Sequence, residues 1–208
     1  YYAHHMSTIE GGMICTNKRE IYEKVRMMRS HGLVREIKEK KLKNQYIKKF
    51  PHLNPEFIFS SMGFNMRNNE IGAIIGLNQL KRLNTNIKKR NINFENFLGK
   101  INKFKFFNEF DLKGSSNYAF NLIIRDKDES YVKKLMKKLQ NNNIEFRRGS
   151  SGGGNQLLQP YLKNYISKNE YKKYPVTDHI HFYGFYIGNY PDLKNSEIDF
   201  ICKTINDV

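Results

Sequence analysis

The first half of the chain places hydrophobic residues at the spacing of amphipathic helices. After capping side chains at residues 16–17, a helix is predicted that ends near Gly32 and carries Ile21, Val25 and Met28. A helix after Asn68 and a separate one over about residues 84–103 are predicted from two apolar sets: Ile71, Ile74, Ile75 and Leu80, then Ile87, Phe94, Leu98 and Ile101. The small residues Gly72, Ala73 and Gly76 predict that the earlier of these two helices packs closely against a neighbour.

Other segments of the first half lack helical periodicity. The apolar run at residues 13–16 follows Gly11-Gly12, which predicts a turn into a strand. Residues 57–59 predict a short strand or an extended segment. Residues 36–54 are rich in lysine, so an exposed loop or a short irregular helix is predicted there.

The second half alternates short apolar runs with helical patterns. Strands are predicted at residues 118–125, 144–147 and 185–188. Two helices are predicted from the spacing of Val132, Leu135, Met136 and Leu139, and of Ile198, Ile201 and Ile205; a cap at Ser196 with Asp199 would open the second. This alternation is typical of the α/β class. We expect a domain boundary between residues 83 and 84, with 84–208 forming a small α/β domain.

Composition favours a globular protein. Hydrophobic residues make up 39% of the 208 residues and aromatic residues 13%, which is enough for a packed core. No apolar run approaches the ~20 residues of a membrane span and no secretory signal opens the sequence, so a soluble protein without membrane partners is expected. Two cysteines match no zinc or iron–sulfur spacing, which favours a reducing cytoplasm and predicts no metal site.

The formal net charge of +16 allows two interpretations. A basic protein can bind nucleic acid, but here lysines are spread through every segment and no recognisable nucleic-acid motif accompanies them. An anionic small molecule, such as a nucleotide sugar, would use the same positive field. We therefore expect no nucleic-acid partner.

The densest chemistry lies in residues 4–12, which contain His4, His5, Ser7, Thr8, Glu10, Gly11 and Gly12. Taken alone, a histidine pair is more often structural or exposed than functional. A metal site would need a third ligand at suitable spacing, which the remaining histidines do not supply.

Residues 4–12 resemble the active-site motif of the DegT/DnrJ/EryC1/StrS family of sugar aminotransferases, which use pyridoxal phosphate. The family pattern is Lys, any residue, an aliphatic residue, Ser or Thr, Thr, any residue and Glu-Gly-Gly, so His4 stands at the lysine position. The run Gly63-Phe64-Asn65-Met66-Arg67, followed by Glu70, Ala73, Gly76, Gln79 and Leu80, is similar to a second family motif. The resemblance implies the C-terminal part of a fold-type-I pyridoxal-phosphate enzyme: the end of its large domain, then a small α/β domain.

Histidine at the lysine position is similar to the GDP-4-keto-6-deoxymannose 3-dehydratase branch of the family, as is the stretch at residues 29–35. The iron–sulfur CDP-sugar 3-dehydratases also have this histidine, but two cysteines cannot hold their cluster. Lysine can bond covalently to the cofactor aldehyde and imidazole cannot, whereas imidazole can still move a proton. The resemblance implies a cofactor held as pyridoxal or pyridoxamine phosphate, a 4-keto-6-deoxy nucleotide sugar that loses its 3-hydroxyl, glutamate as cosubstrate and His4 as acid/base.

The resemblance also implies further site residues. Asn65 is similar to an asparagine that reaches the cofactor phosphate of a neighbouring subunit, which implies a homodimer; otherwise it is an ordinary turn residue. His31, Arg35 and Arg67 are candidates for binding substrate or cosubstrate, and Arg35 could hold a carboxylate in bidentate fashion. Alternatively, Arg35 is a solvated charge after a helix end.

Two departures leave alternatives open. The chain starts at Tyr1 without a methionine, and the family's cofactor-stacking aromatic residue and pyridine-nitrogen aspartate have no counterpart in it, so we expect that an N-terminal portion is missing. A sugar aminotransferase that works without the lysine remains an alternative, as does a non-catalytic fragment. The lysine-rich residues 36–54 match no family pattern.

Overall fold

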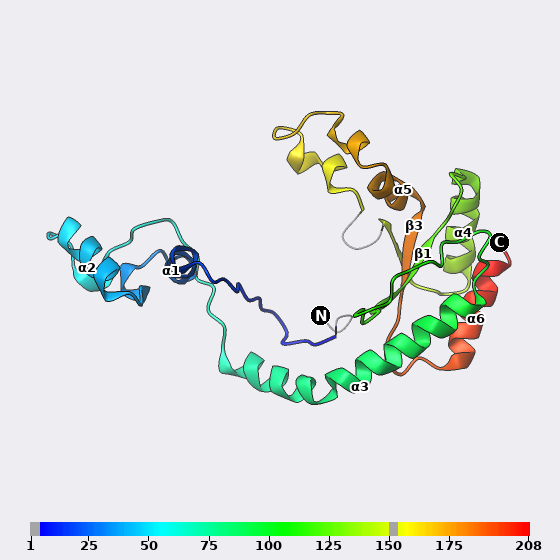
Figure 1. Ribbon diagram of the computed structural model, residues 1–208, viewed down its shortest axis with the longest axis horizontal. Coiled ribbons are helices and arrows are strands. Elements are labelled where there is room, and N and C mark those ends of the chain that lie inside the picture. Colours follow the sequence, from blue (N-terminus) through cyan, green and yellow to red (C-terminus); the bar gives the residue numbers. More distant parts are fainter. Residues whose placement is uncertain (1–4, 150–153) are drawn as a thin grey trace. The chain divides into compact units, whose positions relative to one another are not determined.

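The computed structural model describes residues 5–149 and 154–208 and divides into two compact units (Figure 1). Unit 1 comprises residues 7–78. Unit 2 comprises residues 79–208 together with the N-terminal residues His5 and Met6. Each unit has a hydrophobic cluster of its own.

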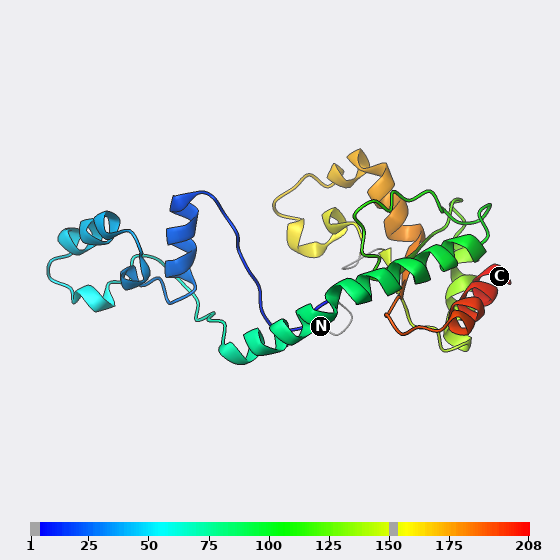
Figure 2. The same ribbon diagram turned by 60° about the horizontal axis from the view of Figure 1, so that its bottom comes forward.

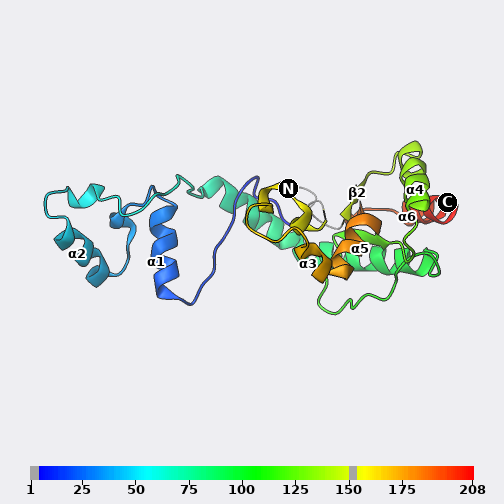
Figure 3. The same ribbon diagram turned by 90° about the horizontal axis from the view of Figure 1, so that it is seen from above.

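Unit 1 is built from short helices around a small core (Figure 3). Its helices are α1 (Arg19–Met28), the 3-10 helix Val34–Glu36, α2 (Lys40–Lys49) and the 3-10 helix Pro55–Phe57. The buried side chains of this core are Met27, Val34, Ile37 and Ile58. One face of α2 and its end pack against them through Leu42, Tyr46, Ile47 and Phe50.

A close backbone crossing holds the segment after α1 against residues 61–66. Phe64 donates to the carbonyl of Met28 over 2.6 Å, and Met66 donates to that of Arg29 over 2.9 Å. Gly32 has φ +80°, and a Cβ there would lie 1.9 Å from the carbonyl oxygen of Ser61. A Cβ at Gly63 would lie 2.3 Å from the amide nitrogen of Gly32. Only glycine fits at these two positions.

Helix α3 (Glu70–Lys100) runs without interruption for 31 residues (Figure 2), so the prediction of two separate helices was wrong. Residues 81–84, where a break was expected, contain neither glycine nor proline, and nothing there ends the hydrogen-bond ladder. Residue 84, the expected domain boundary, lies inside α3, whereas the compact units divide after Asn78.

Unit 2 contains a three-stranded sheet in the order β1-β3-β2: β1 is Ala119–Ile123, β2 is Phe146–Arg148 and β3 is Gly184–Gly188. The central strand β3 is antiparallel to both neighbours, and Ile187 lies opposite Phe120 on one side and Phe146 on the other. Strands β1 and β2 therefore run in the same direction, connected by α4 (Glu129–Asn141).

Helices cover one face of this sheet. Helix α4 and helix α6 (Asn195–Asn206) pack together (Figure 3), and the C-terminal part of α3 completes the layer. The stacked rings of Phe97 and Phe120 have centroids 4.5 Å apart in this core. Between β2 and β3 lie 3-10 helices at Gln156–Leu158, Pro160–Leu162 and Glu170–Lys173, followed by α5 (Pro175–Tyr183).

Several local predictions were wrong. Residues 13–16 form no strand. Helix α1 has Lys18 at its N-cap without a side-chain cap, so the predicted cap at residues 16–17 was wrong. The Thr16 hydroxyl accepts from the amide of Lys18, which precedes the helix. Residues 40–49 form a regular α-helix. Helix α6 is capped at Lys194, whose amide donates to Glu197 over 2.7 Å, and not at Ser196 with Asp199.

No helix within residues 5–149 and 154–208 combines the length and apolar character needed to cross a bilayer. The same residues contain no group of three or more histidine, cysteine or acidic side chains suited to a metal ion.

Candidate functional site

The structure brings part of the predicted site together in unit 1. His4, the predicted acid/base, lies outside the described residues. His31 and Asn65 lie on the two backbone segments that cross after α1: Ser30 pairs with Asn65, and the His31 amide donates to the Phe64 carbonyl over 2.7 Å. Both His31 and Asn65 are exposed. His31 has φ +60°, a left-handed conformation unusual for a residue with a side chain, and the crossing holds it there.

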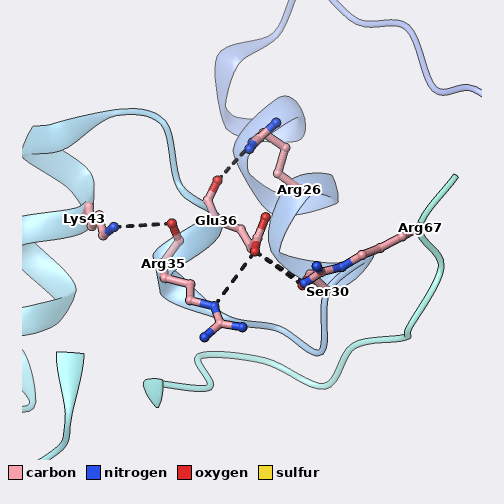
Figure 4. Close-up of polar contacts among 6 residues, drawn as sticks. All are labelled: Arg26, Ser30, Arg35, Glu36, Lys43 and Arg67. Atoms are coloured by element: carbon pink, nitrogen blue, oxygen red, sulfur yellow. Dashed lines mark hydrogen bonds and ion pairs between the residues drawn. The ribbon is translucent and has the colours of Figure 1, made fainter. Parts of the chain in front are cut away.

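Arg35 and Arg67 converge on one carboxylate, that of Glu36 (Figure 4). The Arg67 guanidinium lies 3.6 Å from Glu36 Oε1, and Arg35 Nε lies 4.0 Å from the same oxygen. Arg67 also donates to the hydroxyl of Ser30, which lies 3.4 Å from that oxygen. Residues distant in sequence therefore form one polar cluster, which we call the Glu36 cluster.

Neighbouring side chains fix the backbone of the Glu36 cluster (Figure 4). Arg26 of α1 donates to the Glu36 carbonyl over 2.9 Å, and Lys43 of α2 donates to the Arg35 carbonyl over 3.3 Å. The Arg35 guanidinium lies over the Phe57 ring, 5.3 Å from its centroid. Helix α2, from the lysine-rich stretch that matched no family pattern, thus supports a predicted site residue.

The charges of the Glu36 cluster suit an anionic ligand. Two guanidinium groups face one carboxylate, which leaves one positive charge in excess. The Arg35 side chain is 32% exposed and that of Arg67 53%, whereas Glu36 is 19% exposed. A ligand from solvent can therefore reach the two guanidinium groups more easily than it can reach Glu36. A carboxylate ligand suits them, because its two oxygens match the planar donors of arginine.

Ser30 and Glu36 were missed as site residues from sequence. Ser30 lies within the stretch at residues 29–35 that resembles the family, and Glu36 follows it directly. Their contacts with Arg67 join residues at least 31 positions apart in the chain, which a local pattern does not reveal. The sequence pattern also gave no sign of the structural role of Glu23. It is 1% exposed and accepts from the amides of Lys38 and Glu39 over 2.9 and 3.1 Å, which ties α1 to the start of α2.

The segment after His4 lies against the first turns of α3. A Cβ on Gly76 would lie 3.1 Å from the Thr8 methyl group, and one on Gly72 would lie 3.4 Å from the Thr8 carbonyl oxygen. The small residues of α3 thus make room for the predicted active-site segment. Ile9 has φ +72°, so this segment turns sharply before Glu10, whose amide donates to the Thr8 carbonyl.

A second polar cluster, in unit 2, starts at His5. Its Nε2 lies 3.2 Å from the carbonyl oxygen of Ser116, and its ring meets that of Tyr118 edge-on. Tyr118 meets Tyr186, whose hydroxyl lies 3.4 Å from Arg147. Burial raises the pKa of the Tyr118 phenol, and Tyr186 adds to the effect, so Tyr118 stays neutral at physiological pH.

The DegT/DnrJ/EryC1/StrS aminotransferase family model matches residues 1–206. The chain belongs to this family. Membership confirms the predicted family, and it covers both the motif at residues 4–12 and the run at residues 63–67.

Some similar members of the DegT/DnrJ/EryC1/StrS family are named sugar 3-dehydratases, and others are named sugar transaminases. The GDP-4-keto-6-deoxy-D-mannose 3-dehydratase of Escherichia coli O55:H7 is 30% identical over 207 residues, which are 99% of this chain and 52% of that protein. This chain thus spans about half the length of its relative.

Two solved structures of such enzymes share the fold. The E. coli GDP-4-keto-6-deoxy-D-mannose-3-dehydratase with bound hydrated pyridoxal phosphate superposes with a TM-score of 0.71 at 26% identity, covering 99% of this chain and 52% of that one. A GDP-4-keto-6-deoxymannose-3-dehydratase with a trapped pyridoxal-phosphate–glutamate geminal diamine gives 0.65 at 26% identity, covering 99% and 53%. The predicted fold class is thereby confirmed.

Proposed function

We propose that the protein containing this chain catalyses the 3-dehydration of a 4-keto-6-deoxy nucleotide sugar, with pyridoxal or pyridoxamine phosphate as cofactor and glutamate as cosubstrate. One observation carries the proposal: residues 4–12 resemble the active-site motif of the family, with His4 at the position of the cofactor-binding lysine. The relatives named 3-dehydratases, and the one with a trapped pyridoxal-phosphate–glutamate geminal diamine, support the same reaction. A surface-polysaccharide pathway in the cytoplasm would be the setting.

The described residues fit parts of this cofactor and cosubstrate. Asn65 is exposed beside a turn that Gly63 makes possible, so its amide can donate to a phosphate oxygen. Arg35 and Arg67 offer guanidinium groups to the carboxylate of glutamate, and exposed His31 lies on the same crossing. If Asn65 serves the cofactor of a second copy, the active enzyme is a homodimer.

The bound cofactor would supply an electron sink that stabilises negative charge on a neighbouring carbon. The imidazole of His4 would take a proton from that carbon and return one to the departing hydroxyl at C3 of the sugar. Because imidazole forms no covalent link to the cofactor aldehyde, Asn65 and the other contacts would have to hold the cofactor by non-covalent bonds.

Product analysis of the intact protein tests the proposal. We expect GDP-4-keto-6-deoxymannose, glutamate and pyridoxal phosphate to give a sugar without its 3-oxygen, found by mass spectrometry, together with free ammonia. His4→Asn should lower turnover by at least about a hundredfold, the usual contribution of a general acid/base. Unchanged turnover of His4→Asn would remove His4 from the mechanism.

Transamination to an amino sugar is the second candidate, because the matching family is described as an aminotransferase family. It predicts a 4-amino sugar without released ammonia. Borohydride reduction separates the two further: a covalent cofactor adduct on any lysine would contradict the role of His4. A protein that neither turns over nor binds the cofactor would instead be a non-catalytic relative.

A further inference from the structure

Unit 2 contains a cavity of about 420 Å³. None of the residues assigned above to cofactor or cosubstrate lines it. One wall is a face of α3, and the others are His5 and the loop after β3. Its lining consists of His5, Gln79, Lys81, Arg82, Thr85, Asn86, Lys89, Arg90, Pro191 and Asp192. A volume of this size falls within the range of small-molecule sites, about 300–1,000 Å³.

The α3 wall is a continuous polar face. Arg82, Asn86 and Arg90 are four residues apart along the helix, with Thr85 and Lys89 between them, so their side chains share one side of α3. All five can donate hydrogen bonds. The long, unbroken form of α3 is what brings them to one cavity.

The cavity carries an excess of positive charge. Lys81, Arg82, Lys89 and Arg90 contribute four cationic groups, and Asp192 contributes one carboxylate. That carboxylate is already engaged: Lys89 Nζ lies 2.7 Å from Asp192 Oδ1, and this bond lowers the pKa of Asp192. The lining therefore holds more positive than negative charge.

One of the four cations is buried in the wall, and the other three are exposed. Arg90 is 4% exposed, and its Nε donates to the carbonyl of Asn189 over 3.0 Å, which anchors the loop after β3. Lys81 and Arg82 are exposed on α3. A ligand entering from solvent would therefore meet Lys81 and Arg82 first and the buried guanidinium last.

His5 completes the cavity opposite the helix. Its Nε2 lies 3.2 Å from the Ser116 carbonyl, an acceptor only, so Nε2 carries a proton in that contact.

We propose that this cavity binds the diphosphate group of a nucleotide. Arginine and lysine are the usual partners of phosphoryl oxygens, and hydroxyl and amide donors from Thr85 and Asn86 can complete the contacts. Two sources share this chemistry: the diphosphate of the nucleotide sugar, in which case the inference rests on the proposed function, or a free nucleoside diphosphate acting as an effector.

Calorimetric titration of the intact protein with inorganic pyrophosphate and with GDP tests the site. The variant is Lys81→Gln with Arg82→Gln, which removes two cations that contact nothing assigned to catalysis. The matched control is Lys133→Gln with Lys134→Gln, two adjacent exposed cations on α4 outside the cavity. Circular dichroism checks that both variants keep their helices.

We expect the Lys81/Arg82 variant to bind both probes at least about tenfold more weakly, which corresponds to losing roughly 1.4 kcal/mol. The control should stay within about twofold, the size of a general field effect through screened solvent. Equal binding by the variant and the wild-type protein, or equal weakening in the control, would overturn the proposal, as would no binding of either probe to the wild-type protein.

Turnover separates the two sources. If the variant also raises KM for the nucleotide sugar with kcat unchanged, the site holds the substrate diphosphate. If KM is unchanged while the probes bind weakly, the site holds a free nucleotide. Absence of any turnover would contradict the proposed function alone, because the titrations need no reaction.

Discussion

Glu36 has two roles at the scale of single residues. Its carboxylate neutralises one of the two guanidinium groups beside it and accepts from Ser30, which keeps Arg35 and Arg67 close despite their like charge. The carboxylate of a ligand has to compete with Glu36 for Arg35 and Arg67. The guanidinium groups stay partly exposed at distances of 3.6 and 4.0 Å from Glu36, and ion pairs that solvent reaches are weak, so a bound carboxylate can replace part of this interaction.

Arg67→Gln tests whether this cluster binds glutamate. Because Arg67 is the more exposed of the two arginines, its loss should raise KM for glutamate about tenfold and leave KM for the nucleotide sugar within about twofold. Steady-state kinetics with each substrate varied in turn measures both values. Lys24→Gln, an exposed cation on α1, is the control. Equal changes in both KM values would argue against a glutamate site.

The two cysteines should differ in reactivity. Cys15 is exposed, whereas Cys202 is buried in α6 and burial raises its pKa to about 11. At pH 8 the folded 208-residue chain should thus react with one equivalent of a thiol reagent and with two in denaturant. The raised pKa means that the unfolded chain loses this proton first as pH rises. The contribution of Cys202 to stability is therefore present below pH 9 and declines towards pH 11.

At the scale of elements, α3 connects most of the features described above. Its first turns pack against Thr8 through Gly72 and Gly76, its middle forms the wall of the cationic cavity, and its end contributes Phe94 and Phe97 to the core of unit 2. A loop at residues 81–84 would remove the common helix face that the cavity requires.

Asn84→Pro tests the continuity of α3. Proline inside a helix removes a hydrogen bond and clashes with the preceding turn, so we expect a loss of about 3 kcal/mol or more and less helical circular dichroism. Asn84→Ala should be neutral or slightly stabilising, because alanine has the higher helix propensity and residue 84 is exposed. If the proline variant unfolded at the same urea concentration as the alanine variant, the helix would be interrupted there.

At the scale of the whole molecule, the two units differ greatly in the size of their cores. Among the described residues, the buried cluster of unit 1 consists of Met27, Val34, Ile37 and Ile58, whereas that of unit 2 extends over the sheet, α3, α4 and α6. Apolar burial is the main favourable contribution to folding, so we expect unit 2 to be more stable than unit 1.

Native-state hydrogen exchange of the 208-residue chain can measure this difference. Amides of α1 and α2 should exchange through openings of lower free energy than those of β3, α4 and α6. Urea should then separate the two sets, with unit 1 opening at the lower concentration. A single set of exchange free energies in both units would show that they unfold as one cooperative body.

Features that depend on neighbours along the chain could be predicted from the order of the residues. The spacing of Val132, Leu135 and Leu139 predicted α4, and the apolar runs predicted the three strands, because both periodicities are local. The motif around His4 identified the family, since a motif is read directly from residue types.

Features that depend on contacts between distant residues followed only from the folded chain. Only the backbone crossing at Gly32 and Gly63 brings Arg67 to Glu36, and only the loop after β3 brings Asp192 to Lys89, 103 positions away. Helix α2 has a weak pattern of its own, and packing onto Ile37 and Ile58 gives its apolar side chains a partner. Burial and charge pairing are properties of the folded chain, which local spacing does not contain.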